Sequence, residues 1–265
     1  MHRRDAERAE KNKKLCVLCV SAVNFYGENI LKTIAAFFDV DGTLFTGHVW
    51  RGMLKYFEEK RGKWPVRWFW YYHMPAYFLR KAKLISEERF RGPWGAHLSW
   101  LVKGWDRSQL QGLYDFIANE YVTPHRREDT IGILNDHNQQ GHLTVLVSTG
   151  FTDMVGAIGK TVGAQIAVGT DLEIKNDRAT GNIVPPIVIG AQKMIETKKR
   201  LAARGLDVDF ENSFAYADSI TDMGLFDMVG NPRPVYPDAE LAALAKSKGW
   251  PIHGEAKTVA TSLNG

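Results

Sequence analysis

An apolar run that ends in two aspartates is the feature that most constrains the fold of this chain. Residues 34–38 are apolar, and Asp39-Val40-Asp41-Gly42 follows them directly. The run predicts a short buried strand over residues 34–39, closed by a glycine turn. Residues i and i+2 of a strand point to the same side. The two carboxylates should therefore meet at the carboxyl end of the strand, where open α/β sheets bind their ligands.

Two carboxylates held close together repel each other unless a cation or a shared proton relieves the repulsion. A metal site at Asp39 and Asp41 is therefore the first hypothesis. The alternative is a strand end with two solvated aspartates before a turn. A bare Asp-x-Asp-Gly leaves both interpretations open.

Further apolar runs and turn residues predict strands that alternate with helices. The other predicted strands are residues 143–148, 165–169, 213–218 and 250–252, together with a hairpin of residues 172–175 and 182–184. The predicted helices are residues 128–140, 154–162, 191–204 and 238–248. This alternation predicts an α/β fold with a right-handed, doubly wound parallel sheet.

An insert interrupts this pattern. Residues 49–124 are rich in aromatic side chains and predict mostly helix, with breaks at Gly62, Pro65, Pro75 and Gly92-Pro93. We expect them to form a helical cap, inserted into a catalytic core made of residues 33–48 and 125–254. Residues 1–32 are expected to be an N-terminal extension and residues 255–265 a C-terminal tail.

Three stretches could join Asp39 at the sheet edge. Ser148 ends the second predicted strand, and Thr149-Gly150 leads into a helix, so a hydroxyl and free helix N–H groups could cradle an anion. A simple helix cap is the alternative there. Lys193 lies at a helix start, where a cation opposes the helix dipole. It is either the counter-charge of a carboxylate or phosphoryl cluster, or a solvated lysine.

The third stretch carries two more aspartates. Asp218 ends an apolar strand, and Asp222 follows four residues later, one helical turn away on the same side. A helix cap with an acidic first turn would explain the pair equally well.

Taken together, these motifs resemble the haloacid dehalogenase superfamily of hydrolases, over residues 34–252. The Asp39-Val40-Asp41-Gly42-Thr43 segment, the Ser148-Thr149-Gly150 turn, the Gly190-Ala191-Gln192-Lys193 helix start and the Asp218/Asp222 pair occur in the family's order. They are most similar to the phosphoserine-phosphatase-like subgroup. The resemblance implies a Rossmann-like core with an inserted helical cap, and a Mg²⁺-dependent phosphatase that acts through an aspartyl-phosphate.

The resemblance also implies a role for each motif residue. Asp39 would be the nucleophile and Asp41 the general acid and base. Mg²⁺ would be held by Asp39, the backbone carbonyl of Asp41 and Asp218, with Asp222 in support through water or Lys193. Phosphoryl oxygens would bind Ser148, Thr149, Gly150 and Lys193.

The sequence departs from phosphoserine phosphatases at one point. Those enzymes carry a glutamate shortly after the first motif, which meets the ammonium group of the substrate. Here residues 44–49 hold His48 and no carboxylate. We therefore expect a phosphomonoesterase acting on a small phosphorylated alcohol or a lipid phosphate. The alternatives are a phosphoserine phosphatase, a phosphotransferase, and a non-enzymatic phosphate- or membrane-binding module.

Charge and aromatic content are concentrated in the insert. Residues 50–107 hold 13 Lys and Arg against 5 Asp and Glu, and seven of the eight tryptophans, although the net charge of the whole chain is only +4. These aromatic residues either form the core of the cap or meet an anionic membrane surface. Nucleic acid is the least favoured partner, because no recognition motif is present. Nothing in the sequence specifies an oligomeric state.

The first 32 residues bear on localisation. Residues 15–23 are apolar, but acidic residues before them and the lack of a clear cleavage site argue against a signal peptide. The two cysteines, Cys16 and Cys19, have no second pair, so they predict neither a zinc site nor a disulfide framework. We expect a cytoplasmic protein that could associate peripherally with a membrane.

Overall fold

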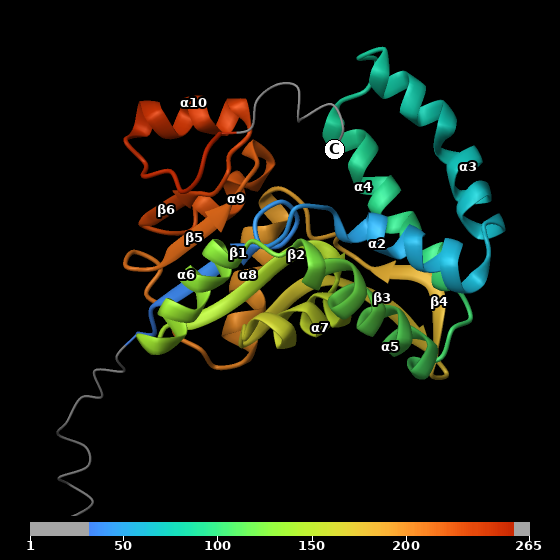
Figure 1. Ribbon diagram of the computed structural model, residues 1–265, viewed down its shortest axis with the longest axis horizontal. Helices are drawn as coiled ribbons and strands as arrows, with labels where there is room; N and C mark the ends of the chain where they lie inside the picture. The colour runs from blue at the N-terminus through green and yellow to red at the C-terminus, as the bar shows by residue number, and fades with distance from the viewer. Residues whose placement is uncertain (1–31, 257–265) are drawn as a thin grey trace, which may run out of the picture. The chain divides into compact units, whose positions relative to one another are not determined.

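A six-stranded sheet forms the centre of the computed structural model, which describes residues 32–256 (Figure 1). The strands lie in the spatial order β4-β3-β2-β1-β5-β6. All neighbouring strands are parallel except β3 and β4, which form an antiparallel hairpin at one edge. The predicted α/β fold is therefore confirmed. The strands are β1 (Ala35–Asp39), β2 (Leu143–Phe151), β3 (Ile166–Lys175), β4 (Arg178–Val184), β5 (Phe214–Ala217) and β6 (Asn231–Pro234).

Helices cover both faces of the sheet, as the alternation of side chains along β1 requires. Ala36 and Phe38 belong to a buried cluster with residues of α6 (Glu128–Gln139) and α7 (Thr152–Val162). Ala35 and Phe37 point the other way. They join a cluster with residues of α8 (Ala191–Ala203), α9 (Met223–Phe226) and α10 (Ala239–Lys248).

The register of the central strands sets the position of the site. Asp39, the last residue of β1, pairs with Val147 of β2, so Ser148 comes one step beyond it. On the other side of β1, Phe38 pairs with Tyr216 of β5. Asp218, two residues further along the chain, therefore reaches the same edge. Three adjacent parallel strands therefore bring Asp39, Ser148 and Asp218 to the same edge of the sheet.

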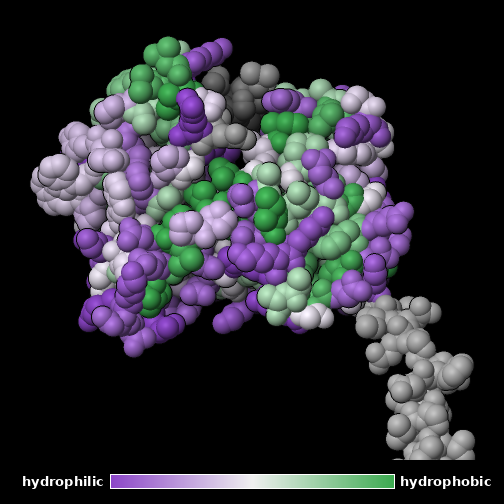
Figure 2. Space-filling view, turned by 180° about the vertical axis from the view of Figure 1, so that it is seen from behind, coloured by the Kyte–Doolittle hydropathy of each residue, from purple (hydrophilic) through white to green (hydrophobic). Residues whose placement is uncertain are grey.

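A helical segment between β1 and β2 forms the cap (Figure 1). Its longest helix, α3, exposes many of its aromatic residues. Figure 2 shows the surface of the molecule from the side opposite to that of Figure 1. The elements are α2 (Val49–Tyr56), η1 (Phe57–Arg61), α3 (Trp64–Lys81), α4 (Glu87–His97), η2 (Leu98–Val102), α5 (Arg107–Asp115), η3 (Phe116–Val122) and η4 (Thr123–His125).

Two of the predicted helix breaks in this segment are wrong. Helix α3 runs through Pro75, and α4 runs through Gly92 and Pro93. A proline inside a helix loses its own N–H bond and frees one carbonyl of the preceding turn. Both prolines are exposed, so water can take the freed carbonyl, and both helices continue.

The strand predicted over residues 250–252 is also wrong. The structure has a single bridge there, between Val235 and His253, while the last strand of the sheet is β6. Its Asn-Pro-Arg-Pro sequence argues against a central strand, because proline cannot donate to the ladder. At the sheet edge, β6 needs bonds on one side only, and it pairs with β5.

The segments around the second and third strands are longer and more continuous than predicted. Strand β2 extends to Phe151, and helix α7 begins at Thr152 rather than Met154. The two strands predicted between residues 165 and 175 are one strand, β3. The predicted hairpin exists, but its turn is only Asn176-Asp177, both with positive φ. Such values are typical of tight two-residue hairpins.

Residues 1–31 and 257–265 lie outside the described part of the chain. Most of the predicted N-terminal extension, both cysteines and most of the C-terminal tail fall there. Within residues 32–256, no helix combines the length and apolar character needed to cross a bilayer.

Candidate active site

Asp39 lies at the bottom of the site, at the carboxyl end of the central strand β1. Its side chain is buried, and one of its oxygens, Oδ1, accepts a 2.6 Å hydrogen bond from Nζ of Lys193. Asp41 follows in the turn, where Oδ1 accepts a 3.0 Å bond from the N–H of Val49. Gly42 takes a positive φ of 80° there, which costs glycine little.

Lys193 links two of the aspartates. Gly190, with a positive φ of 53°, precedes α8 and leads the chain into it, so Lys193 occurs in its first turn. Its Nζ donates to Oδ1 of Asp39 and, at 2.5 Å, to Oδ1 of Asp222. All three side chains are buried, so the lysine charge compensates carboxylates that would otherwise be unpaired away from water.

A cluster of three buried carboxylates forms beside this lysine. Asp39, Asp218 and Asp222 each offer an oxygen, and these oxygens lie within 4.8 Å of one another. Thr43 approaches Asp218 with its hydroxyl 3.5 Å from Oδ1. Several hard oxygen donors at short separation are the ligands that Mg²⁺ takes in proteins. These oxygen donors therefore fit Mg²⁺. Asp222 belongs to this carboxylate cluster and also forms the ion pair with Lys193.

The pKa values of the site reflect burial of like charges. Burial raises the pKa of Asp39, against the charge of Lys193, while Asp218 adds to the rise. Burial, with the charge of Asp39, raises the pKa of Asp41 to about 7. Burial also raises the pKa of Asp222, to about 6, against the lysine charge. Burial alone would lower the pKa of Lys193, but the two carboxylates outweigh it and hold that pKa above its ordinary value.

The last residues of β2, where its pairing with β3 is irregular between Val147 and Phe151, supply further polar groups to the site. Ser148 is buried, and its Oγ accepts a 3.1 Å hydrogen bond from the N–H of Gly150. The carbonyl of Thr149 accepts a 2.9 Å bond from the hydroxyl of Thr170 on β3. These bonds fix the end of β2 just before the N-terminus of α7, where backbone N–H groups favour an anion.

All eight residues predicted from sequence line one cavity of about 740 Å³. They are Asp39, Asp41, Ser148, Thr149, Gly150, Lys193, Asp218 and Asp222. The structure thus brings together groups that lie up to 183 positions apart in the chain.

The cap supplies a large part of the remaining cavity wall, with residues that sequence reasoning did not assign to the site. Aromatic rings and guanidinium groups line it: Trp50, Trp70, Tyr77, Phe90 and Trp94, with Arg51, Arg80 and Arg91. Their proximity to Asp39 arises only when the cap folds over the core, so no local pattern could reveal it.

Arg127 was also missed, although it follows the predicted return of the chain from the cap. Its Nε donates a 3.1 Å hydrogen bond to the carbonyl of Gly42, and its guanidinium lies 3.7 Å from the centre of the Tyr236 ring. It therefore supports the turn that carries Asp41.

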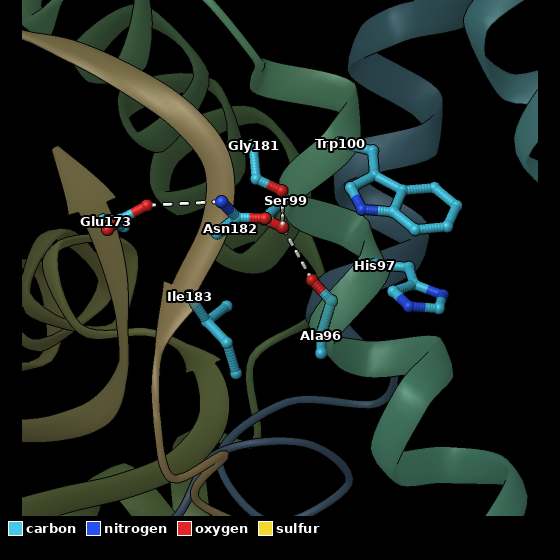
Figure 3. A pocket seen from close by; sticks show the side chains of 8 residues that line it. All are labelled: Ala96, His97, Ser99, Trp100, Glu173, Gly181, Asn182 and Ile183. Atoms are coloured by element: carbon cyan, nitrogen blue, oxygen red, sulfur yellow. Dashed lines mark hydrogen bonds between the residues drawn. The ribbon is translucent and has the colours of Figure 1, made fainter. Parts of the chain in front are cut away.

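A second cavity, of about 500 Å³, lies between the cap and the β3–β4 hairpin (Figure 3). Its polar groups bond to one another. The Ser99 hydroxyl is 2.7 Å from the carbonyl oxygens of both Ala96 and Gly181, and Nδ2 of Asn182 donates to Glu173 at 3.3 Å. None of the predicted site residues lines this cavity, so the first cavity is the candidate active site.

Known proteins share this fold and sequence pattern. A phosphoserine phosphatase of Mycobacterium tuberculosis is 26% identical over 83% of this chain and 70% of its own length. A probable phosphatase of the same organism is 29% identical over 59% of this chain, and the match spans only about half (53%) of that relative. A solved structure of a Bordetella pertussis protein of unknown function has a TM-score of 0.72 at 21% identity, covering 84% of this chain and 99% of that one.

The family match covers most of the chain. Residues 36–227 match the haloacid dehalogenase-like hydrolases, and this range contains all of β1 except Ala35, the whole cap and all eight residues predicted for the site. The chain belongs to the haloacid dehalogenase-like hydrolase family.

Proposed function

We propose that the protein is a Mg²⁺-dependent phosphomonoesterase that works through an aspartyl-phosphate on Asp39. The observation that carries the proposal is the single cavity in which a buried carboxylate, a paired lysine and an acid cluster face Ser148 and the α7 N-terminus. The two relatives named phosphatases support it.

The first step transfers the phosphoryl group to the protein. A carboxylate oxygen of Asp39 attacks phosphorus, the bond to the ester oxygen breaks, and Asp41 gives its proton to the departing alkoxide. Mg²⁺, held by Asp39, Asp218 and the backbone carbonyl of Asp41 with support from Asp222, would supply charge neutralisation for the phosphoryl oxygens. Ser148 and the N–H groups before α7 would orient these oxygens.

The second step releases phosphate. Asp41, now a carboxylate, accepts a proton from water while that water attacks phosphorus. The bond between phosphorus and the Asp39 oxygen breaks, which restores the Asp39 carboxylate and frees inorganic phosphate. A pKa of about 7 for Asp41 suits both proton transfers, since a group that gives and takes a proton works best near the operating pH.

We infer that phosphoserine is not the preferred substrate. Apart from the four aspartates of the site, the only carboxylate among the described residues of the cavity wall is Asp238. Asp238 is occupied as the N-cap of α10, accepting from the N–H groups of Leu241 and Ile220. Among the described residues of the cavity wall, no other acidic side chain is therefore placed to meet an ammonium group.

The size and lining of the cavity favour a larger leaving group. About 740 Å³ lies in the upper part of the range of roughly 300–1,000 Å³ that holds drug-sized ligands. Aromatic rings beside arginines suit an apolar or planar alcohol. Uncharged alkyl phosphates and acyl-glycerol phosphates are the classes that we expect to be hydrolysed best.

The test is release of phosphate from p-nitrophenyl phosphate and from a panel of phosphomonoesters, with Mg²⁺ and after chelation. We expect activity with Mg²⁺, its loss with a chelator and its return on adding Mg²⁺. Asp39→Asn should abolish turnover, because an amide is a poor nucleophile. The matched control, Asp227→Asn, replaces an exposed aspartate outside the cavity wall and should keep activity. Full activity in Asp39→Asn, or highest kcat/KM for phosphoserine, would contradict the proposal.

A further inference from the structure

The outward side of α3 is covered with exposed aromatic side chains. Trp64, Trp68, Tyr71 and Tyr72 are each 62% to 69% exposed, and Phe78 and Leu79 extend the same surface. Spacings of three, four, seven and eight residues put these side chains on one side of a helix. We call this set of six residues the α3 face.

Most of the α3 face points away from the packed interior, although the Tyr72 ring also meets Trp100, with the ring centres 4.9 Å apart. The opposite side of the helix already supplies buried residues, Val66, Phe69 and His73, and lines the cavity with Trp70 and Tyr77. Single exposed apolar residues are common on protein surfaces, but a contiguous row of large ones marks an interaction site.

The charged residues of α3 and its immediate flanks in the chain all have one sign. Residues 60–86 contain seven Lys and Arg and no Asp or Glu. Among them, Lys63, Arg67 and Lys81 are exposed, and the Arg67 guanidinium lies 5.7 Å from the centre of the Trp64 ring. In Figure 2, α3 lies along the upper left edge of the molecule. Residues of intermediate hydropathy (pale) lie there next to a hydrophobic patch (green) and strongly hydrophilic residues (purple).

This combination matches one kind of partner. Trp and Tyr concentrate where a bilayer meets water, and nearby Lys and Arg are attracted by anionic headgroups. A helix with such a face lies in the plane of the interface without crossing the bilayer. The described residues contain no helix that could span one. We propose that the α3 face docks the protein on anionic phospholipid membranes.

Co-sedimentation of the full chain with vesicles tests the proposal. The vesicles are phosphatidylcholine alone, or phosphatidylcholine with phosphatidylglycerol, each at low and high salt. We expect binding to the anionic vesicles that is about tenfold or more tighter than to neutral ones. High salt should weaken it without abolishing it, because salt screens the cations but not the inserted rings.

Variants locate the contact. A triple variant, Trp64→Ser/Trp68→Ser/Tyr71→Ser, should lose about tenfold or more in binding to anionic vesicles. Lys63→Gln/Arg67→Gln/Lys81→Gln should lose a similar factor and most of the salt dependence. The matched control, Val184→Ser/Ile195→Ser, removes exposed apolar residues outside α3 and should bind like the parent. Equal melting temperatures would show that each variant is folded.

Two results would overturn the proposal. One is no lipid-dependent pelleting of the parent. The other is unchanged binding by the aromatic variant, which would place the contact elsewhere in the chain. A lipid-free parent that sediments as a dimer, ignores vesicles and becomes monomeric in the aromatic variant would assign the α3 face to a second copy of the chain instead.

Discussion

At the scale of single residues, the proposed selectivity against phosphoserine rests on His48, which stands where an acidic residue would meet an ammonium group. Its Nδ1 lies 3.9 Å from Oδ2 of Asp41, so a carboxylate at this position would enter the same cavity. We predict that His48→Glu raises the ratio of kcat/KM for phosphoserine to that for ethyl phosphate by about tenfold, the value of one charge-assisted contact. The ratio is used because a new charge beside Asp41 would lower both rates.

The control for this prediction is His48→Gln, which has the same reach as glutamate but no charge. It should leave the ratio as in the parent. A ratio that stays constant in His48→Glu would mean that the leaving group does not pass this side chain.

His137 predicts how stability depends on pH. It is buried in α6, 2.8 Å from the hydroxyl of Tyr216 and 2.8 Å from Nδ1 of His142. Burial, with the charge of His142, lowers its pKa to about 4. Between the ordinary pKa of about 6.5 and this value, the unfolded chain binds a proton that the folded protein excludes. The free energy of unfolding should therefore fall as the pH falls from about 6.5 toward 4.

Urea unfolding at several pH values measures this dependence. His137→Gln cannot titrate, so its free energy of unfolding should change less over the same range. The exposed His125→Gln serves as the control and should keep the parental slope. A His137→Gln protein with the parental slope would assign the acid sensitivity to other groups.

At the scale of elements, the junction of β2 with α7 depends on a glycine of the next strand. A Cβ added to Gly169 in β3 would lie 2.5 Å from the carbonyl oxygen of Gly150 and 2.9 Å from the nitrogen of Thr152. Both atoms are backbone, so the junction of β2 with α7, next to Ser148, would have to move. We predict that Gly169→Ala lowers the free energy of unfolding by about 1–3 kcal/mol and also reduces kcat.

Gly156→Ala is the matched comparison, within α7. A Cβ there meets only Ala167, at an ordinary 3.9 Å. Alanine should stabilise this helix by about 0.5–1 kcal/mol and leave kcat unchanged. Chemical unfolding measures the change in stability of both variants, and steady-state kinetics measures kcat. Equal kcat in the two variants would contradict a role for Gly169 in positioning the junction of β2 with α7.

The same elements show what the sequence could predict. Asp39 and Asp218 could be placed at the sheet edge because each follows an apolar run, and apolar runs indicate buried strands. Lys193 could be placed at a helix start because a glycine precedes it. Strand β6 could not be predicted, because its two prolines are unusual in a strand. The break predicted at Pro75 was wrong, because the carbonyl that this exposed proline leaves without a partner can bond to water.

At the scale of the whole molecule, the sequence predicts both the core and a helical cap, but not how the cap packs onto the core. The wall opposite Asp39, including Trp50 and Trp94, depends on how the cap packs onto the sheet, which no local periodicity encodes. Nor could periodicity decide which rings of α3 face outward, since both sides of that helix are apolar. The proposals on substrate choice and membrane contact therefore rest on the structure, while the proposed chemistry at Asp39 could be expected from sequence.

The most direct test of this chemistry is to trap the phosphorylated protein. The protein reacts with p-nitrophenyl phosphate labelled in the phosphoryl group, is quenched in acid, and is mapped by peptide analysis. We predict label on the peptide that contains Asp39, with the hydroxylamine sensitivity of an acyl phosphate. The label should accumulate in Asp41→Asn, because p-nitrophenolate leaves without a proton while attack by water loses its base. It should be absent from Asp39→Asn. Label on any other residue, or turnover by Asp39→Asn, would contradict the account.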